Sequence, residues 1–423
     1  MTGLVACGGG STSTPVPPPS ATPDFSNTVF IGDSLSSGFQ NGSLLDTQQP
    51  NGWASLVAHQ ANTPITLPLM AAPGVPAVMK LVSVGPPPVT TTASGVSSGR
   101  DNPSAQPTDL AVPGHHLHDL INAGPTLLPT SKEDIITALI LGLPAGNTNT
   151  QLQEAIALKP TTLFVWIGSN DALVADDKGT PSSMTPIASF TSDFTQLMST
   201  LHGKSSARLI VANLPDVTSI PYLTPSAMIL AEAAAQTGES TAQLGTALGL
   251  ATGDLVTAQG LTEVQAALSA IKSGKAPTPL DDAGVLTAAE VQQVQALEDQ
   301  YNQVIAQQVS AVGGTLIDMH AFFQKLGAGM TINGVNATTG YLGGLFGLDG
   351  IHPTNTGYAL VANQFIDSLN AGLKTSFADV DVSTIASADP LFGPNIKPST
   401  SAVHISAAAA KQAGVFLHTR GQE

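Results

Sequence analysis

The stretch VFIGDSLSSGFQNG, residues 29–42, begins as an apolar run that ends abruptly in a glycine, an acid and a serine. Together with Thr28, the run has no polar alternation, which is typical of a strand buried on both faces. Gly32, Asp33 and Ser34 then form a turn signal where that strand ends. The pattern predicts either an ordinary turn or a serine held at the edge of a buried parallel sheet.

Four further short apolar runs follow along the chain. They cover residues 108–112, 162–167, 208–213 and 314–319, and Asp109 interrupts the first of them. Apolar residues also recur every three or four positions over residues 187–201 and 358–369, which predicts helices. Alternating strands and helices predict an α/β fold with a central parallel sheet and right-handed crossovers. In such a sheet the reactive site lies beyond the carboxyl ends of the strands.

Two stretches interrupt this alternation. Residues 70–106 are rich in Pro, Ser, Thr and Gly and are predicted to form a surface loop. Residues 219–300 show helical patterns, with a capping box that starts at Thr287 and a weaker one that starts at Thr262. They predict a helical insertion between two strands. It acts either as a lid over the site or as a layer packed on the core.

The termini differ from the rest of the chain. Cys7 is the only cysteine, so no intrachain disulfide forms. It ends the tetrapeptide LVAC and precedes a Gly/Ser/Pro-rich stretch, which resembles the lipobox of bacterial lipoproteins. The six residues before Cys7 are too few for a full signal peptide. The alternative is therefore that the match arises by chance and that Cys7 is a free cysteine in a disordered tail. We expect a lipobox-like start and disordered linker over 1–25, a catalytic domain over 26–373 and a partly disordered extension over 374–423.

Composition limits the partners. The net charge is −16 and only 10% of residues are charged, which argues against a nucleic-acid partner because phosphate binding needs clustered Lys and Arg. A neutral or weakly polar substrate fits this charge more easily. The resemblance to a lipobox predicts that the protein lies in the extracytoplasmic bacterial cell envelope, tethered to a membrane through a lipidated Cys7. The alternative is a secreted protein.

Four short segments stand at the ends of the predicted elements: GDSL (32–35), AVPG (111–114), GSND (168–171) and DGIHP (349–353). In this order they resemble the GDSL, or SGNH, hydrolase family, whose four blocks contribute Ser, Gly, Asn and His. The resemblance covers residues 26–372 apart from the insertions. It implies a flavodoxin-like three-layer α/β/α sandwich, the SGNH hydrolase fold. It also implies a serine carboxylic-ester hydrolase, an esterase or lipase working through an acyl-enzyme, with no cofactor and no metal.

The chemistry of these residue types agrees with that resemblance. A serine hydroxyl is a poor nucleophile at neutral pH, so a base must take its proton during attack. His352 is the candidate base, and Asp349, three residues earlier, is placed to fix its tautomer. By resemblance to the family, the oxyanion is bound by the backbone N–H groups of Ser34 and Gly114 and by the side chain of Asn170.

These residues also have purely structural interpretations. Ser34 would cap a helix, Asn170 would form a turn, and His352 would be a packed core histidine. Asp33 is interpreted as structural, because it can accept hydrogen bonds from the backbone of the tight turn. Asp216, which follows another predicted strand, is the rival candidate for the third member of the triad.

Two further patterns suggest other chemistry. Ser97 lies in GVSSG, which matches the nucleophile elbow of α/β-hydrolases, but no strand precedes it and no helix follows it. We therefore expect no catalytic role for Ser97. His115, His116 and His118 permit a metal site, but we favour the solvated start of a helix that lines the active site.

The substrate is less closely defined. The family implies a small-molecule or lipid ester, and its range includes carbohydrate deacetylases, lysophospholipases and thioesterases; a surface-binding lipoprotein is the non-enzyme alternative. Aromatic residues make up only 4% of the chain, which favours lipidic or simple esters over sugars. Met228, Ile229 and Leu230 suggest that an apolar acyl chain lies beneath the insertion. The natural acyl and alcohol groups and the oligomeric state stay open.

Overall fold

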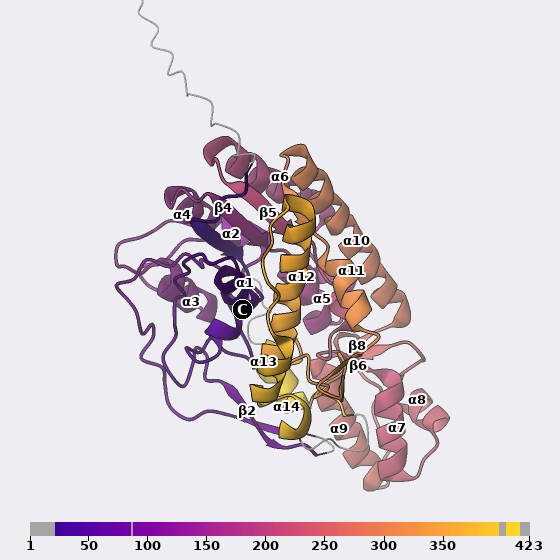
Figure 1. The fold of residues 1–423 in the computed structure, drawn as a ribbon. Coiled ribbons are helices and arrows are strands. Elements are labelled where there is room, and N and C mark those ends of the chain that lie inside the picture. Colours follow the sequence, from indigo (N-terminus) through magenta and orange to yellow (C-terminus); the bar gives the residue numbers. More distant parts are fainter. Residues whose placement is uncertain (1–21, 86–87, 397–402, 415–423) are drawn as a thin grey trace, which may run out of the picture.

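A parallel sheet lies at the centre of the fold (Figure 1). Its strands, in spatial order, are β1 (Thr28–Gly32), β4 (Thr162–Trp166), β5 (Arg208–Ala212) and β9 (Thr315–Ile317). Each corresponds to a predicted apolar run, and β1 and β4 are buried along their whole length. The computed structural model describes residues 22–85, 88–396 and 403–414, so Cys7 and most of the predicted linker lie outside the described residues.

The fifth predicted run, residues 108–112, lies beside β1 but is not a regular strand. The backbone N–H of Phe30 donates to the carbonyl of Thr108, and that of Val112 donates to the carbonyl of Gly32. Only Asp109 makes a parallel bridge, with Phe30. Its side chain accepts from the backbone two residues ahead at 3.1 Å, and such local bonds compete with a strand ladder. The segment nevertheless extends the sheet on its β1 side.

Helices cover the sheet in two layers, which confirms the predicted α/β architecture. One layer contains α1 (Trp53–Gln60) and α12 (Asn355–Leu373), which pack against each other. The other contains α2 (Leu117–Asn122), α4 (Gln151–Ala157), α6 (Ile187–Lys204) and α10 (Ala288–Ala311). The remaining helices of the domain are α3 (Lys132–Leu141), α5 (Ser169–Lys178) and α11 (Met319–Leu326). The predicted helices over 187–201 and 358–369 are thus α6 and α12.

The insertion between β5 and β9 is only partly the helical segment predicted over 219–300. Its helices α7 (Ser226–Thr237), α8 (Thr241–Leu248) and α9 (Ala258–Lys272) project away from the sheet (Figure 1). A small antiparallel sheet joins them, formed by β6 (Thr224–Pro225), β7 (Leu255–Val256) and β8 (Val285–Leu286). The box at Thr287 caps α10 as predicted, but α10 packs on α6 in the main domain. The prediction of a capping box that starts at Thr262 is wrong, because α9 begins earlier and is capped by Thr257.

The outer segments also carry structure. The predicted loop 70–106 contains a hairpin of β2 (Met79–Ser83) and β3 (Val89–Thr92). A second hairpin, β10 (Met330–Ile332) and β11 (Val335–Ala337), follows α11. Beyond residue 373, α13 (Val382–Ala388) packs on α12, and α14 (Ala407–Ala413) packs on α9 and β3. Among the described residues, no helix is both long enough and apolar enough to cross a bilayer.

Candidate active site

The candidate site lies where the strand order of the sheet reverses. β1 has residues 108–112 on one side and β4 on the other. The connection after β1 therefore runs to one side of it, and the next connection, to β4, crosses to the other side. Ligands of open α/β sheets bind at such a switch point, outside the carboxyl ends of the strands. Ser34, Gly114 and Asn170 each follow one of these three neighbouring segments within a few residues. The structure therefore brings the first three predicted blocks to one edge.

Two glycines permit this close meeting of loops. A Cβ atom at Gly32 would lie 2.2 Å from the carbonyl oxygen of Trp166, at the end of the neighbouring strand. Gly114 has a φ of +82°, a left-handed conformation that side chains disfavour. A side chain at Gly32 would clash with that carbonyl, and a side chain at Gly114 would be held in a strained backbone conformation.

Ser34, His352 and Asp349 form a connected row of buried side chains. The Ser34 hydroxyl lies 2.7 Å from Nε2 of His352, and Nδ1 of the same ring lies 3.1 Å from Oδ2 of Asp349. The ring of Phe39 packs against the imidazole with 4.7 Å between centroids. Because the carboxylate accepts a hydrogen bond from Nδ1–H and so fixes this tautomer, Nε2 presents a lone pair to the serine hydroxyl. The row is arranged for proton transfer from Ser34 to His352.

The carboxylate of Asp349 accepts hydrogen bonds from four N–H groups. Its Oδ1 accepts from the backbone of Ile351 and of His352, both at 2.9 Å, and its Oδ2 accepts from the backbone of Gly42 at 2.7 Å, beside the imidazole Nδ1. Burial would raise the pKa of Asp349, but the charge of His352 and these hydrogen bonds outweigh it and lower the pKa. The carboxylate is therefore ionised when it faces the imidazole.

Side chains from the first block also hold the loop that carries His352. The amide of Gln40 donates to the carbonyl of Pro353 at 3.1 Å, and Asn41 accepts from the backbone N–H of Leu348 at 2.8 Å. These bonds span more than 300 residues of sequence. The nucleophile turn and the histidine loop are thus bound to each other directly.

The predicted oxyanion donors follow three neighbouring segments at this edge of the sheet. The side-chain amide of Asn170 donates one hydrogen to the carbonyl of His115 at 2.9 Å, which leaves its second hydrogen for another acceptor. The backbone N–H groups of Ser34 and Gly114 donate to no other group of residues 22–85, 88–396 and 403–414. Asp171 fixes the start of α5 by accepting from the backbone N–H of Leu117 at 2.9 Å. These three N–H groups are available for an oxyanion.

Three other candidates have structural partners. Asp216 accepts from the backbone and hydroxyl of Thr218, and thereby caps the short 3₁₀ helix over 217–219. Asp33 accepts from the backbone of Leu35 at 3.0 Å, as expected for a turn former, and burial raises its pKa to about 7. Ser97 donates to a backbone carbonyl at 2.6 Å inside the 70–106 segment.

The histidines after Gly114 form no metal centre. In the described part of the chain, no group of three or more His, Cys, Asp or Glu side chains is placed to hold a metal ion. His115 and His116 are buried, so the expectation of a solvated helix start is wrong for them. The His118 side chain is exposed, and its Nδ1 lies 3.0 Å from the carboxylate of Asp193.

Gln151 and His115 connect the predicted site residues through hydrogen bonds, a connection that the sequence analysis missed. Gln151 was not considered there, and His115 was treated only as a metal-ligand candidate or as part of a solvated helix start. The backbone N–H of Gly32 donates to Oε1 of Gln151 at 3.0 Å, so the amide nitrogen faces Nδ1 of His115, also at 3.0 Å. The imidazole proton is then on Nε2, which donates to Thr137 at 2.9 Å. Because the carbonyl of His115 accepts from Asn170, this chain of bonds joins the nucleophile turn to the oxyanion donors. No local pattern signals a bond across 119 residues.

Replacing Gln151 with leucine is expected to lower kcat by about 10- to 100-fold with little change in KM, because a misplacement of about 1 Å has that effect on rate. The measurement is steady-state kinetics with a short-chain ester. The matched control is Gln153→Leu on the same helix, which removes the capping bond to Thr150 at 3.1 Å and should lower only the melting temperature. Equal effects of the two variants on kcat would exclude a positioning role for Gln151.

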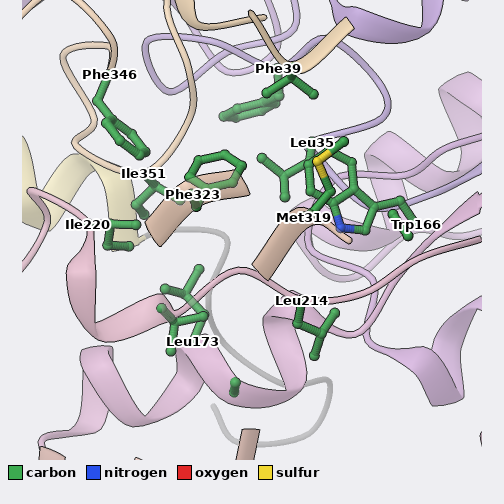
Figure 2. Close-up of a cluster of buried hydrophobic side chains, with 14 of the residues drawn as sticks. Leu35, Phe39, Trp166, Leu173, Leu214, Ile220, Met319, Phe323, Phe346 and Ile351 are labelled. Carbon is green, nitrogen blue, oxygen red and sulfur yellow. The ribbon is translucent and has the colours of Figure 1, made fainter. Parts of the chain in front are cut away.

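A small apolar pocket of about 30 Å³ lies beside Ser34. Its apolar walls include Leu35, Leu173, Ile220, Phe323, Phe346 and Ile351, most of which face one another in Figure 2. Ser34, Asn170 and His352 line its polar side. Of the insertion predicted as a lid, only Ile220, at its first turn, lines this pocket. The expectation that Met228, Ile229 and Leu230 cover the acyl group is therefore wrong for this pocket.

Comparison with known proteins places these features in context. The family model described as GDSL-like Lipase/Acylhydrolase matches residues 28–365. LAE5, an alpha/beta hydrolase enzyme from the metagenome of Lake Arreo, Spain, is similar at 12% identity over 84% of this chain and 99% of that one, with a TM-score of 0.40. An acetyl xylan esterase from Geobacillus stearothermophilus is similar at 13% identity over 85% of this chain and 100% of that one, with a TM-score of 0.39. No curated protein matches the sequence.

Proposed function

This chain belongs to the GDSL-like lipase/acylhydrolase family and is a carboxylic-ester hydrolase, and we propose that it works through an acyl-enzyme formed on Ser34. The observation that carries the proposal is the distance of 2.7 Å between the Ser34 hydroxyl and Nε2 of His352. A serine in contact with an oriented imidazole is an activated nucleophile. The buried and ionised Asp349 on the far side of the ring supplies the orientation.

The reaction begins when Oγ of Ser34 attacks the ester carbonyl carbon and Nε2 of His352 takes the hydroxyl proton. The N–H groups of Ser34, Gly114 and Asn170 bind the resulting oxyanion, and each such donor typically contributes about 10²- to 10³-fold in rate. The bond to the alcohol oxygen then breaks, and the imidazolium gives its proton to the departing alcohol. A water molecule repeats these steps on the acyl-enzyme, which releases the carboxylic acid and restores Ser34.

The pocket beside Ser34 supports a short acyl group. A volume of about 30 Å³ on this scale holds about two groups of the size of water. Away from its polar side, its walls are apolar, which suits the methyl or ethyl group of an acetyl or propionyl ester. The long acyl chain of a lysophospholipid exceeds this volume. Among the alternatives within the family, the pocket therefore favours esterases of small acyl groups, including deacetylases, over lysophospholipases.

A fluorophosphonate probe tests the acyl-enzyme proposal. The Ser34 oxygen should displace fluoride from phosphorus, so the protein gains one phosphonyl group that peptide mass spectrometry locates on Ser34. The His352→Ala variant should react far more slowly, because its serine keeps its proton. Modification at Ser97 instead of Ser34, or no modification of folded wild-type protein, would contradict the proposal.

A further inference from the structure

A second and larger cavity adjoins the acyl pocket, and we call it the side cavity. Its volume is about 380 Å³, within the range of about 300–1,000 Å³ that is usual for ligand pockets. Ile220 lines both the acyl pocket and the side cavity, and so forms their common wall. The other walls come from β6, α7 and β7 of the insertion, from the loop 338–341 and from residues 403–404.

The side cavity has a fixed place relative to the reacting atoms. The backbone N–H of Tyr222, next to the cavity wall, donates to the carbonyl of Gly350 at 2.9 Å. Tyr341 also lines the cavity, and its hydroxyl donates to the carbonyl of Leu348 at 2.9 Å. Both partners belong to the loop that carries His352. These two parts of the cavity wall are thus bound to the loop whose imidazole serves the leaving alcohol.

The lining of the side cavity is mixed in polarity. Met228 and Leu255 supply apolar surface, and the half-buried Thr339 supplies a hydroxyl. No Asp, Glu, Lys or Arg is among the residues that line it. The imidazole of His404 also lines it, and its Nε2 lies 2.7 Å from the carboxylate of Glu232, so this wall presents a paired group and not an isolated charge.

We propose that the side cavity is the alcohol subsite of this esterase and that it takes a neutral, amphipathic alcohol. The proposal rests on the proposed function and names the half of the substrate that the small acyl pocket leaves outside. The acyl group fills the pocket beside Ser34, and the alcohol runs past Ile220 into the side cavity. There its apolar part contacts Met228 and Leu255, and its oxygen pairs with the hydroxyl of Thr339.

Filling the side cavity tests this assignment. Met228→Trp places a larger side chain in the cavity wall, and the matched control Ala227→Trp adds the same ring at an exposed position of the same helix. We expect Met228→Trp to raise KM for 2-(2-butoxyethoxy)ethyl acetate by at least about tenfold. The KM for methyl acetate, whose alcohol does not reach the cavity, should stay within about twofold of wild type, as should both values in the control.

Removing a hydroxyl from the cavity lining gives a second, independent test. Thr339→Val keeps the shape of a half-buried side chain, so we expect the melting temperature to stay within about 2 °C of wild type. The same variant should show a KM several-fold higher for the glycol-ether acetate and an unchanged KM for methyl acetate. An unchanged KM for both esters would exclude a contact between this hydroxyl and the alcohol.

The two proposals fail in different ways. If wild-type protein does not hydrolyse methyl acetate, the proposed acyl-enzyme chemistry is wrong. If it hydrolyses methyl acetate but Met228→Trp and Ala227→Trp affect both esters equally, the chemistry stands and the alcohol subsite lies elsewhere. Selective loss of the larger ester in Met228→Trp is the outcome that supports the side cavity.

Discussion

Alanine in place of Ser34 is expected to lower kcat/KM for a short-chain ester by about 10⁴- to 10⁶-fold. Without its oxygen, His352 has no nucleophile to activate, and only water attack on an oriented ester remains. The hydroxyl contacts the imidazole and lies at the edge of a pocket, so its removal should leave the fold intact. The measurement is the initial rate on p-nitrophenyl acetate, with the melting temperature recorded for the same preparation.

Ser97→Ala is the matched control, because Ser97 lies in the one sequence pattern that rivals the first block. Its hydroxyl donates to the carbonyl of Ala71 at 2.6 Å and accepts from the backbone of Gly99 at 3.2 Å. Losing these bonds should lower stability by about 1 kcal/mol and leave kcat/KM within about twofold. If Ser97→Ala abolished activity and Ser34→Ala did not, the assignment of the nucleophile would be wrong.

The sheet was predictable because β1, β4 and β5 are buried along all or nearly all of their length and are therefore almost continuously apolar. The run over residues 108–112 forms a single bridge and no regular strand, because the carboxylate of Asp109 accepts a hydrogen bond from the local backbone. The small sheet of the insertion escaped prediction because strands of two residues carry no periodicity. At α9 two threonines compete as caps, and the structure uses Thr257, which precedes the one predicted.

The proposed site was predictable where a residue stands directly after a strand. Ser34, Gly114 and Asn170 do so, and the parallel register of neighbouring strands brings them together without further information. The role of Gln151 was not predictable, because its partners are set by how α4 packs on β1. The apolar pocket was missed for the same reason: Phe323 and Phe346 come from segments that meet only in the folded chain.

Asp349→Asn is expected to lower kcat by about 10⁴-fold with little change in KM. Both oxygens of the carboxylate accept N–H groups, so an amide nitrogen finds no suitable place. At the Oδ1 position it would face the backbone N–H groups of Ile351 and His352. At the Oδ2 position it would face Gly42 and force the imidazole proton onto Nε2, where the ring can no longer take the proton of Ser34.

Asp216→Asn decides between the two acids considered for this role. Asp216 accepts hydrogen bonds from Thr218 and Gln295, and among the described residues it makes none with the imidazole of His352. Its amide variant should therefore keep kcat within about twofold of wild type and lose only stability. Asp349→Asn should also lose stability, by about 1–3 kcal/mol, since buried donors lose their acceptor. The change in kcat therefore separates the two variants. A loss confined to Asp216→Asn would move the third member of the triad to the loop after β5.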